Sequence, residues 1–509
     1  MSISGPALPP DISPLVWPQV LSLARRHPDK EAVVAPSIRL SYRQMVQEVF
    51  RYQRALSALG LTPGDRLAVM VGNDWPYLAL YWASLASGLV FVPLNPKLAR
   101  PEVATLLQHA EPALVVVDDR LIAQIPESLG YPTRALSQWQ RLVSQASPAP
   151  YDPYPATPDD VALIFYTSGT TGQPKGVMLT HRNLAVQYYQ AVDYLLALES
   201  DDRVFSCYPL HATAQHVFLA PPLIAGATTV IEPFSPTTIL TRLEQEAVTI
   251  FFAVPSIYQI LLQHERFSAR FLPHLRLLAY GANLMTLETI QRLKQRFPHA
   301  LLKNLYGQTE NSPSVSSLDD PDALTKPGSV GRPVPGMTIA IVDEADREVP
   351  PGVVGEIVTR GPNLMKGYYK DEAATQASLR GGWYHTGDLG YCDSEGYLYV
   401  IDRKKDIITR GGQNIYPLEI ETILNQHPAV RECAVIGVPH RILGEEVAAV
   451  IVRRLGADAT EAVIREYLLE RLAAYKVPVH YYFVDALPHN ASGRVLKREL
   501  RHLLHHDGV

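Results

Sequence analysis

The segment 166–176, YTSGTTGQPKG, holds residue types that bind phosphate groups. Its glycines, Gly169, Gly172 and Gly176, let the backbone adopt unusual dihedral angles and approach a ligand closely. The N–H groups of such a loop form a concave anion site, to which the hydroxyl side chains add donors and Lys175 adds a positive charge. The loop is not a P-loop, because Lys175 is followed by glycine and not by Ser or Thr. By composition alone, a flexible surface loop remains the alternative.

Four other segments carry ordered motifs, namely YGQTE (306–310), WYHTGD (383–388), YLYVIDRKKDIITRGGQNIYPLEIE (397–421) and LPHNASGRVLKREL (487–500). Together with the phosphate loop they resemble the adenylate-forming superfamily, which includes acyl-CoA synthetases, aryl-CoA ligases, beetle luciferases and the adenylation domains of peptide synthetases. The resemblance extends over roughly residues 20–505. It implies an AMP-forming acid–thiol ligase that uses ATP, Mg²⁺ and coenzyme A.

The implied reaction has two halves: a carboxylate attacks the α-phosphorus of ATP to give acyl-AMP and pyrophosphate, and a thiol then displaces AMP. Because the first half brings an anion toward a tetra-anion, it requires cations and oriented dipoles where negative charge builds up. By the resemblance, the loop holds the β- and γ-phosphates, Thr309 binds the α-phosphate, and Glu310 holds Mg²⁺ together with Thr170. The expected catalytic residues are Lys175, Thr309, Glu310 and Arg494.

The resemblance also assigns residues to the rest of the nucleotide. Tyr306 stacks near adenine, Asp388 accepts hydrogen bonds from the ribose hydroxyls, and Arg403 assists it. Taken singly, a core tyrosine, a turn-capping aspartate and a surface arginine are the simpler interpretations, and it is the order of the motifs that favours a site. The residues expected to bind ATP or coenzyme A are Thr167, Ser168, Gly169, Thr170, Thr171, Gly172, Gly281, Ala282, Asn304, Tyr306, Gly307, Gln308, Asp388, Arg403, Gly411 and Gly412.

The C-terminal part carries an expected hinge and one departure from the family pattern. The hinge falls on Lys405, about which a mobile C-terminal domain rotates between the two half-reactions; a plain linker is the alternative. The family has a lysine after the glycine of its C-terminal loop, bridging the carboxylate and the α-phosphate, where this chain has Arg494. Arginine keeps the charge in a longer planar fork, and Lys497 substitutes only if the loop shifts. We expect Arg494 to serve, with slow adenylation or a thioester-only enzyme as alternatives.

The acyl pocket is expected at turns that contain His211, Ala212, Gly281 and Asn311. His211 is equally well explained as a residue that structures its own turn. No basic residue marks a second carboxylate, so an uncharged aliphatic or aryl acid is expected. The resemblance, including GPNLMKGYYKDEAAT (361–375), favours a medium- or long-chain fatty acid. The alternatives are an aryl-CoA ligase, an acyl-AMP ligase that loads a separate carrier protein, and an adenylation-impaired homologue that only binds a nucleotide or acyl group.

A scaffold must position these motifs, and the sequence pattern predicts layers of sheets and helices. Apolar runs at 67–72, 89–94 and 113–119 predict buried strands, and 237–247 and 287–297 have the apolar spacing of helices. Alternation of this kind predicts an α/β fold with mainly parallel sheets.

Beyond about residue 330 the pattern changes to short strands with frequent Gly and Pro, which predicts a β-rich subdomain over 330–404. We therefore expect a large N-terminal domain over 1–404, which binds ATP and the acyl group, and a small mobile α+β domain over 405–509.

Composition narrows the class of protein further. With 509 residues, 47% of them hydrophobic, and a net charge of −5, the chain is globular and lacks the basic surface of a nucleic-acid-binding protein. Cys207, Cys392 and Cys433 are far apart, so we expect free thiols in a reducing compartment. The N-terminus lacks a signal-peptide pattern, and the apolar stretch 75–95 is punctuated by proline and glycine, which predicts a buried helix and strand rather than a membrane span. We expect a cytoplasmic enzyme, of an oligomeric state that its sequence leaves open.

Overall fold

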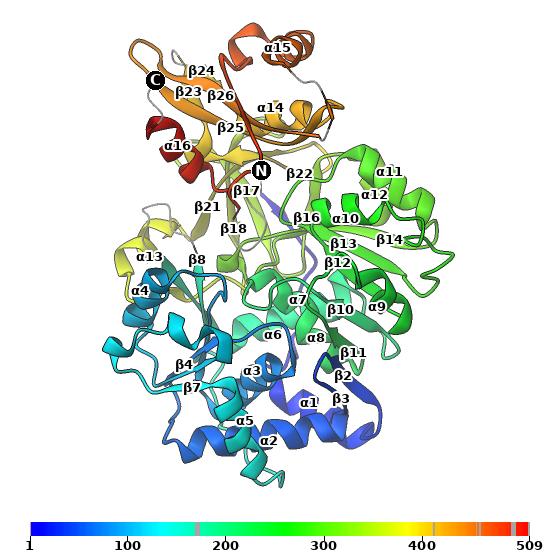
Figure 1. Ribbon diagram of the computed structural model, residues 1–509, viewed down its shortest axis with the longest axis vertical. Helices are drawn as coiled ribbons and strands as arrows, with labels where there is room; N and C mark the ends of the chain where they lie inside the picture. Colours follow the sequence, from blue (N-terminus) through cyan, green and yellow to red (C-terminus); the bar gives the residue numbers. More distant parts are fainter. Residues whose placement is uncertain are drawn as a thin grey trace. The chain divides into compact units, whose positions relative to one another are not determined.

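The computed structural model describes residues 2–167, 174–410, 413–454, 456–457, 460–489 and 495–506. The chain forms two compact units. The larger unit comprises Ile3–Ile339 and Thr359–Tyr384, and the smaller unit comprises Met1–Ser2, Ala340–Val358 and His385–Val509. The expected boundary between residues 404 and 405 stays a prediction. Both units combine helices and sheets, which confirms the α/β class (Figure 1).

The first sheet of the larger unit has seven strands in the order β19-β9-β8-β5-β4-β6-β7. Five of them are parallel, and β9 and β19 pair antiparallel at one edge. Their bounds are β4 Arg66–Met70, β5 Val90–Pro93, β6 Leu114–Val117, β7 Thr133–Ala135, β8 Val161–Thr167, β9 Lys175–Thr180 and β19 Gly367–Tyr368. The strands predicted at 67–72, 89–94 and 113–119 are therefore confirmed, in a mainly parallel sheet.

The second sheet of the larger unit runs β16-β15-β14-β13-β12-β10-β11-β2-β3. From β14 to β2 every pair is parallel, and the outer strands β3, β15 and β16 are antiparallel. Their bounds are β2 Glu31–Ala35, β3 Ile38–Ser41, β10 Arg203–Ser206, β11 Thr228–Ile231, β12 Ile250–Ala253, β13 Leu277–Gly281, β14 Leu301–Tyr306, β15 Ser316–Leu318 and β16 Ser329–Pro333. A parallel block of this kind brings the carboxyl ends of its strands to one edge.

Helix α3 (Trp75–Ser87) is the central helix of the larger unit and is buried on nearly every side. Asp74 accepts a hydrogen bond from its first N–H group, and Gly88, at a φ of 69°, ends it in the left-handed conformation. The hydrophobic core around α3 contains side chains of both sheets, such as Phe91 and Ala32. The helix is therefore apolar on all sides. The buried helix running into a strand is confirmed.

Helices α9 (Ile239–Gln245), α10 (Pro255–Leu261) and α11 (Leu287–Arg296) cover one face of the second sheet. Figure 1 shows these helices beside strands β12 to β14. Their apolar stripes share a core with Phe251 and Leu278 of the strands, as the predicted helical spacing requires.

The smaller unit contains most of strands β17 (Thr338–Val342), β18 (Gly355–Arg360) and β21 (Trp383–Cys392) and the whole of β22 (Leu398–Arg403). A 3₁₀ turn at Lys404–Asp406 follows. The rest of this unit is a five-stranded sheet with three helices. The strands are β23 (Ile408–Arg410), β24 (Gln413–Ile415), β25 (Val430–His440), β26 (Gly444–Arg453) and β27 (His480–Val484). The helices are α14 (Pro417–Leu424), α15 (Glu461–Leu469) and α16 (Lys497–His506). Helices α14 and α15 share one core with this sheet.

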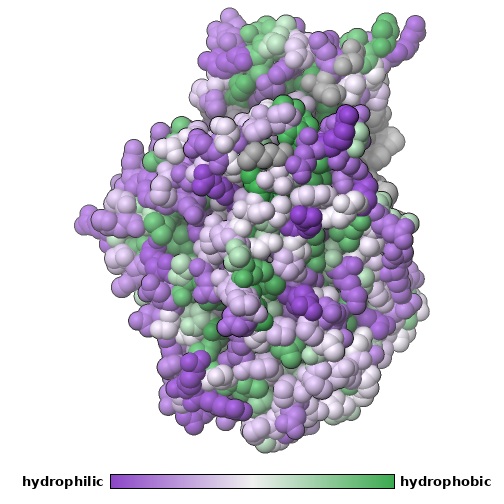
Figure 2. Space-filling view, turned by 180° about the vertical axis from the view of Figure 1, so that it is seen from behind, coloured by the Kyte–Doolittle hydropathy of each residue, from purple (hydrophilic) through white to green (hydrophobic). Residues whose placement is uncertain are grey.

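On the face drawn in Figure 2, hydrophobic residues are scattered among hydrophilic ones. Among the described residues, no helix combines the length and the apolar character needed to cross a membrane. The three cysteines are buried and unpaired.

Candidate active site

The candidate site of the larger unit lies where parallel strands end. Loops leave the carboxyl ends of β10, β13 and β14, and these loops contain the predicted residues His211, Ala282 and Thr309. In open α/β sheets the crevice at the carboxyl ends is where ligands bind. The scaffold therefore collects residues that are about a hundred positions apart in the chain.

The phosphate loop is the connection of an antiparallel hairpin. Thr167 at the end of β8 is opposite Lys175 at the start of β9, and Tyr166 is opposite Gly176. The predicted residues Ser168, Gly169, Thr170, Thr171 and Gly172 lie outside the described residues. Lys175 is held by an aromatic ring, because its Nζ atom lies 4.7 Å from the ring centroid of Tyr368.

The YGQTE motif forms a tight turn directly after β14. A Cβ atom on Gly307 would lie 1.9 Å from the carbonyl oxygen of Pro313, so only glycine fits there. Thr309 begins a 3₁₀ turn, and its hydroxyl lies 3.0 Å from the hydroxyl of Thr213. The carboxylate oxygen Oε1 of Glu310 accepts a hydrogen bond of 3.0 Å from Tyr368.

Neighbouring predicted residues support this turn rather than project from it. Asn304 is buried in β14 and donates from Nδ2 to the carbonyl of Ser329 at 3.2 Å. Gln308 Oε1 accepts a hydrogen bond of 2.9 Å from the hydroxyl of Tyr384. Tyr306 is the last residue of β14 and is partly buried. The adenine-stacking role of Tyr306 stays a prediction.

A buried network of polar residues, here called the polar seam, holds the residues that follow the YGQTE turn. It consists of Asn311, Ser312, Ser314, Thr359 and Asn363. Asn363 donates from Nδ2 to the carbonyls of Asn311 and Ser314, at 2.9 and 2.7 Å. Ser312 donates to the carbonyl of Asn363 at 2.7 Å, and Thr359 donates to Oδ1 of Asn311 at 2.9 Å. Asn311, predicted to contact the acyl group, is fully buried within this seam. Its side chain therefore holds the turn, and substrate contact stays a prediction.

The predicted acyl-pocket loop is anchored on α3 and on Asn73, which lies two residues before this helix begins. Asn73 donates to the carbonyl of Tyr208 at 2.9 Å and accepts from the N–H group of Leu210 at 3.2 Å. The hydroxyl of Tyr77 donates to the carbonyl of Leu210 at 2.7 Å. These bonds fix the backbone immediately before His211. The loop is therefore placed by a helix that precedes it by more than a hundred residues.

His211 itself is a neutral polar group at the candidate pocket. Its Nε2 atom is buried and has no hydrogen-bond partner within the part of the chain that the structure describes. Burial, aided by the charge of Lys97, lowers the pKa of His211 to about 4. The imidazole is therefore uncharged near neutral pH, and a ligand can use its unsatisfied nitrogen. Ala212, beside it, is partly buried.

The turn after β13 has the tight backbone expected of a nucleotide-facing loop. A Cβ atom on Gly281 would lie 2.5 Å from the carbonyl oxygen of Leu305, its register partner in β14. Ala282 has a φ of 67°, an uncommon left-handed conformation for a residue other than glycine. Strain of this kind often accompanies functional loops, but the roles of both residues stay predictions.

In the smaller unit the structure pairs two of the predicted residues. Asp388 and Arg403 are opposite each other on β21 and β22, and Arg403 Nε lies 3.0 Å from Asp388 Oδ1. Asp388 is nearly inaccessible to solvent, so its charge is compensated inside the protein. Lys405 lies in the 3₁₀ turn. Gly411, Gly412 and Arg494 lie outside the described residues.

Lys497 has a partner of its own in the smaller unit. Its Nζ atom lies 2.8 Å from Oε1 of Glu421, and both side chains are largely buried. The same oxygen of Glu421 accepts the N–H group of Val435 at 2.7 Å. Lys497 therefore joins α16 to α14 and β25.

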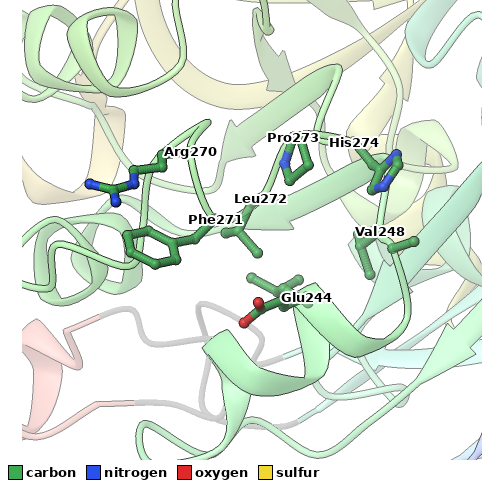
Figure 3. A pocket seen from close by; sticks show the side chains of 9 residues that line it. Glu244, Val248, Arg270, Phe271, Leu272, Pro273 and His274 are labelled. Atoms are coloured by element: carbon green, nitrogen blue, oxygen red, sulfur yellow. The ribbon is translucent and has the colours of Figure 1, made fainter.

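A separate hollow of about 280 Å³ lies between α9 and the segment before β13 (Figure 3). It is lined by Glu244, Phe271 and His274 among others, and in Figure 3 the guanidinium of Arg270 points away from its centre. These residues precede β12 and β13, so the hollow is at the amino ends of the parallel strands, opposite the loops described above. Glu244 is already paired with Arg266 at 2.6 Å. This hollow is not the candidate active site.

Two residues that the sequence did not single out contact predicted site residues, namely Thr213 and Tyr368. Tyr368 is part of GPNLMKGYYKDEAAT, which the sequence marked only as a family resemblance. Thr213 is in the acyl-pocket turn, two residues after His211. Nothing local distinguishes either residue, because their roles come from contacts with distant segments.

Comparison with known proteins agrees with this geometry. Residues 22–369 match the AMP-binding enzyme family, and residues 419–494 match the AMP-binding enzyme C-terminal domain. The chain belongs to this family, the adenylate-forming superfamily of acid–CoA ligases.

Individual relatives define the reaction class. The chain is 38% identical to a feruloyl-CoA synthase of Amycolatopsis, covering 95% of this chain and 98% of that protein. It is 36% identical to an indoleacetate–CoA ligase of Aromatoleum aromaticum, covering 94% and 96%. Fatty acid ligases that use coenzyme A or an acyl-carrier protein are also among its relatives, at 32% identity. The crystal structure of ATP-bound MatB from Rhodopseudomonas palustris superimposes with a TM-score of 0.88 at 33% identity, covering 96% of this chain and 98% of that one.

By family, therefore, the protein is an AMP-forming acid–CoA ligase, and the substrates of this family are a carboxylic acid, ATP and coenzyme A.

Proposed function

We propose that the enzyme activates a hydrophobic monocarboxylic acid, an aromatic acid in the first place, as its acyl-AMP and transfers the acyl group to coenzyme A. The observation that supports adenylation is that Lys175 and Glu310 both contact the same side chain, that of Tyr368. A cation and a carboxylate are thus held at one side chain at the carboxyl ends of the strands, and Thr309 directly precedes Glu310 in the chain.

Each of these groups has a distinct task in the adenylation step. The acid's carboxylate attacks the α-phosphorus, and the pyrophosphate that leaves carries the displaced electron pair. Lys175 attracts the outer phosphates, and Thr309 donates its hydroxyl to an α-phosphate oxygen, where negative charge is redistributed. The bridging cation between carboxylate and α-phosphate is Arg494.

The donor set also fits a magnesium ion. Mg²⁺ binds through one or two carboxylates together with substrate phosphates, and Glu310 offers a carboxylate whose neighbour, the Tyr368 hydroxyl, is uncharged. A bound Mg²⁺ supplies charge neutralisation on the phosphate oxygens. Glu310, with Thr170 from the loop, is the residue we assign to hold it.

The aromatic preference is supported by the relatives that are named for aromatic acids, at 38% and 36% identity. His211 offers a hydrogen-bonding group for the acid, because burial, together with the charge of Lys97, lowers the pKa of its imidazole to about 4 and keeps it neutral. A medium- or long-chain fatty acid is the second candidate, because fatty acid ligases are also relatives.

An acid panel tests this proposal directly. The enzyme is incubated with ATP, Mg²⁺ and either ferulate, indoleacetate, benzoate, octanoate or palmitate, and pyrophosphate release is measured with and without coenzyme A. We expect an aromatic acid to have the highest kcat/KM and to give a thioester. Highest kcat/KM with palmitate or octanoate establishes the fatty acid alternative, and no pyrophosphate with any acid overturns the adenylation proposal.

The acceptor is tested in the same assay. We propose coenzyme A because the two aromatic-acid relatives are CoA enzymes by name. Replacing coenzyme A with a phosphopantetheinylated carrier protein distinguishes the alternative, since a carrier-specific enzyme transfers the acyl group only to the carrier.

We propose a cytoplasmic location on the basis of the three cysteines. All are buried free thiols, the state that a reducing compartment maintains.

A further inference from the structure

The segment that contains Tyr368 is attached directly to the strand that carries Lys175. β19 pairs antiparallel with β9, with Tyr368 opposite Val177. The N–H group of Tyr369 donates to the carbonyl of Gly176 at 2.7 Å, one residue after Lys175. Any displacement of β19 is therefore transmitted to the phosphate hairpin.

The same segment is attached to the YGQTE turn. The N–H group of Met365 donates to the carbonyl of Glu310 at 2.8 Å. Tyr368 itself is fixed at its backbone, because its N–H group donates to the hydroxyl of Thr375 at 2.9 Å, and that hydroxyl donates to the carbonyl of Asp371 at 2.8 Å. Tyr368 thus belongs to a rigid connection between two loops from different sheets.

The side chain of Tyr368 contacts two charged groups, one through its ring and the other through its hydroxyl. Its ring faces the ammonium group of Lys175, at 4.7 Å from Nζ to the centroid, a geometry in which the negative face of the ring attracts the cation. Its hydroxyl donates to Oε1 of Glu310 at 3.0 Å. The residue is 6% exposed, so water competes little with either contact.

We propose that Tyr368 is a positioning residue that holds Lys175 toward the phosphates and orients the carboxylate of Glu310 toward the cation of ATP. The inference rests on the proposed adenylation function and deepens it. Tyr368 touches neither reacting atom, and its effect passes through Lys175 and Glu310.

A neutral side chain suits this position. An ionisable partner would form an ion pair with one of the two charges and weaken its attraction for phosphate or cation. The phenol hydroxyl of Tyr368 is a neutral donor, so its hydrogen bond to Oε1 of Glu310 brings no opposite charge to the carboxylate.

Two substitutions separate the two contacts. Tyr368→Phe keeps the ring beside Lys175 and removes the hydroxyl from Glu310, whereas Tyr368→Leu removes both. Tyr42→Phe is the control, because Tyr42 is also a buried tyrosine with a hydrogen-bonded hydroxyl, but its acceptor is the carbonyl of Ala227, at 2.7 Å, which is not part of these loops.

The principal readout is ATP binding to the full chain by calorimetry, without any acid, over a series of Mg²⁺ concentrations. For Tyr368→Phe we expect the Mg²⁺ concentration that gives half-maximal ATP binding to rise about tenfold, the lower end of the losses caused by removing a partner of a metal ligand. At saturating Mg²⁺ its ATP affinity stays near that of wild type. Tyr368→Leu shows the same shift and also binds ATP more weakly at saturating Mg²⁺. Tyr42→Phe leaves both quantities unchanged.

Wild-type Mg²⁺ dependence in Tyr368→Phe overturns the inference, as does an equal shift in Tyr42→Phe, which would indicate a general loss of stability. Should Tyr368→Leu fail to fold, Tyr368→Phe decides the question by itself. Failure of the proposed function gives a different result: wild-type protein then binds ATP with Mg²⁺ but releases no pyrophosphate with any acid of the panel.

Discussion

The hydroxyl of Thr213 lies 3.0 Å from the hydroxyl of Thr309. Thr213 is in the turn expected to line the acyl pocket, and Thr309 is the residue expected to bind the α-phosphate. One hydrogen bond therefore connects the acid side of the site with the phosphate side. If Thr309 donates its proton to a phosphate oxygen, Thr213 is the donor that satisfies the oxygen of Thr309.

The first prediction concerns this pair. We expect Thr213→Val to lower kcat for pyrophosphate release by about threefold to tenfold, the range that corresponds to one net hydrogen bond, with little change in the KM for ATP. Thr213→Ser keeps the hydroxyl and should remain close to wild type. Equal losses in the serine and valine variants would show that packing, not the hydrogen bond, is what matters.

The second prediction concerns Asp388, which is paired with Arg403 at 3.0 Å. If Asp388 accepts hydrogen bonds from ribose, Asp388→Asn raises the KM for ATP by at least about tenfold, since hydrogen bonds to a charged group are the stronger kind. The specific readout is 2′-deoxy-ATP and 3′-deoxy-ATP. The variant should lose less with a nucleotide that already lacks the contacted hydroxyl, and an identical loss with all three nucleotides would argue against ribose recognition.

The third prediction separates Arg494 from Lys497. Because Lys497 is paired with Glu421 at 2.8 Å, we expect Lys497→Met to lower the free energy of unfolding by about 2 kcal/mol, less than the loss from a fully buried pair, while adenylation persists. Arg494→Ala should instead reduce pyrophosphate release by at least about a hundredfold, as removal of a charge-stabilising donor does, and Arg494→Lys should restore part of it. Unchanged adenylation in Arg494→Ala would show that Arg494 is not the bridging group.

The fourth prediction concerns the dependence of stability on pH. Burial lowers the pKa of His216 to about 3, below its ordinary value of about 6.5. Between these two values the unfolded chain binds a proton that the folded chain does not, so this contribution to stability is complete above about pH 6.5 and is lost as the pH falls toward 3.

For His216→Gln we therefore expect the unfolding free energy to depend less steeply on pH over this window. The decrease in slope corresponds to up to about one proton fewer taken up on unfolding. Chemical unfolding at a series of pH values from 4 to 8 measures it. Superimposable slopes for wild type and variant would contradict the prediction. Above pH 7 the variant is expected to be less stable, because the imidazole also packs against Tyr81 and Phe165.

Local pattern was sufficient to predict several elements of this fold. The apolar runs that became β4, β5 and β6, and the helical spacing that became α9 and α11, are properties of consecutive residues, and burial of apolar side chains acts on them in the same way in every layered α/β protein. The ordered glycines and hydroxyls of the phosphate loop and the YGQTE motif were recognisable for the same reason.

By itself, then, the sequence determined the class of the protein, its ATP chemistry and the identity of its candidate charged groups, because those depend on residue type and short-range order. Only the tertiary structure decided that Tyr368 holds Glu310 across 58 positions of the chain and that Thr213 meets Thr309 across 96. It also decided that Lys497 forms an ion pair with Glu421 and that Asn311 is buried in the polar seam. Such pairings depend on which strands are adjacent and in what register, and no short stretch of residues contains that information.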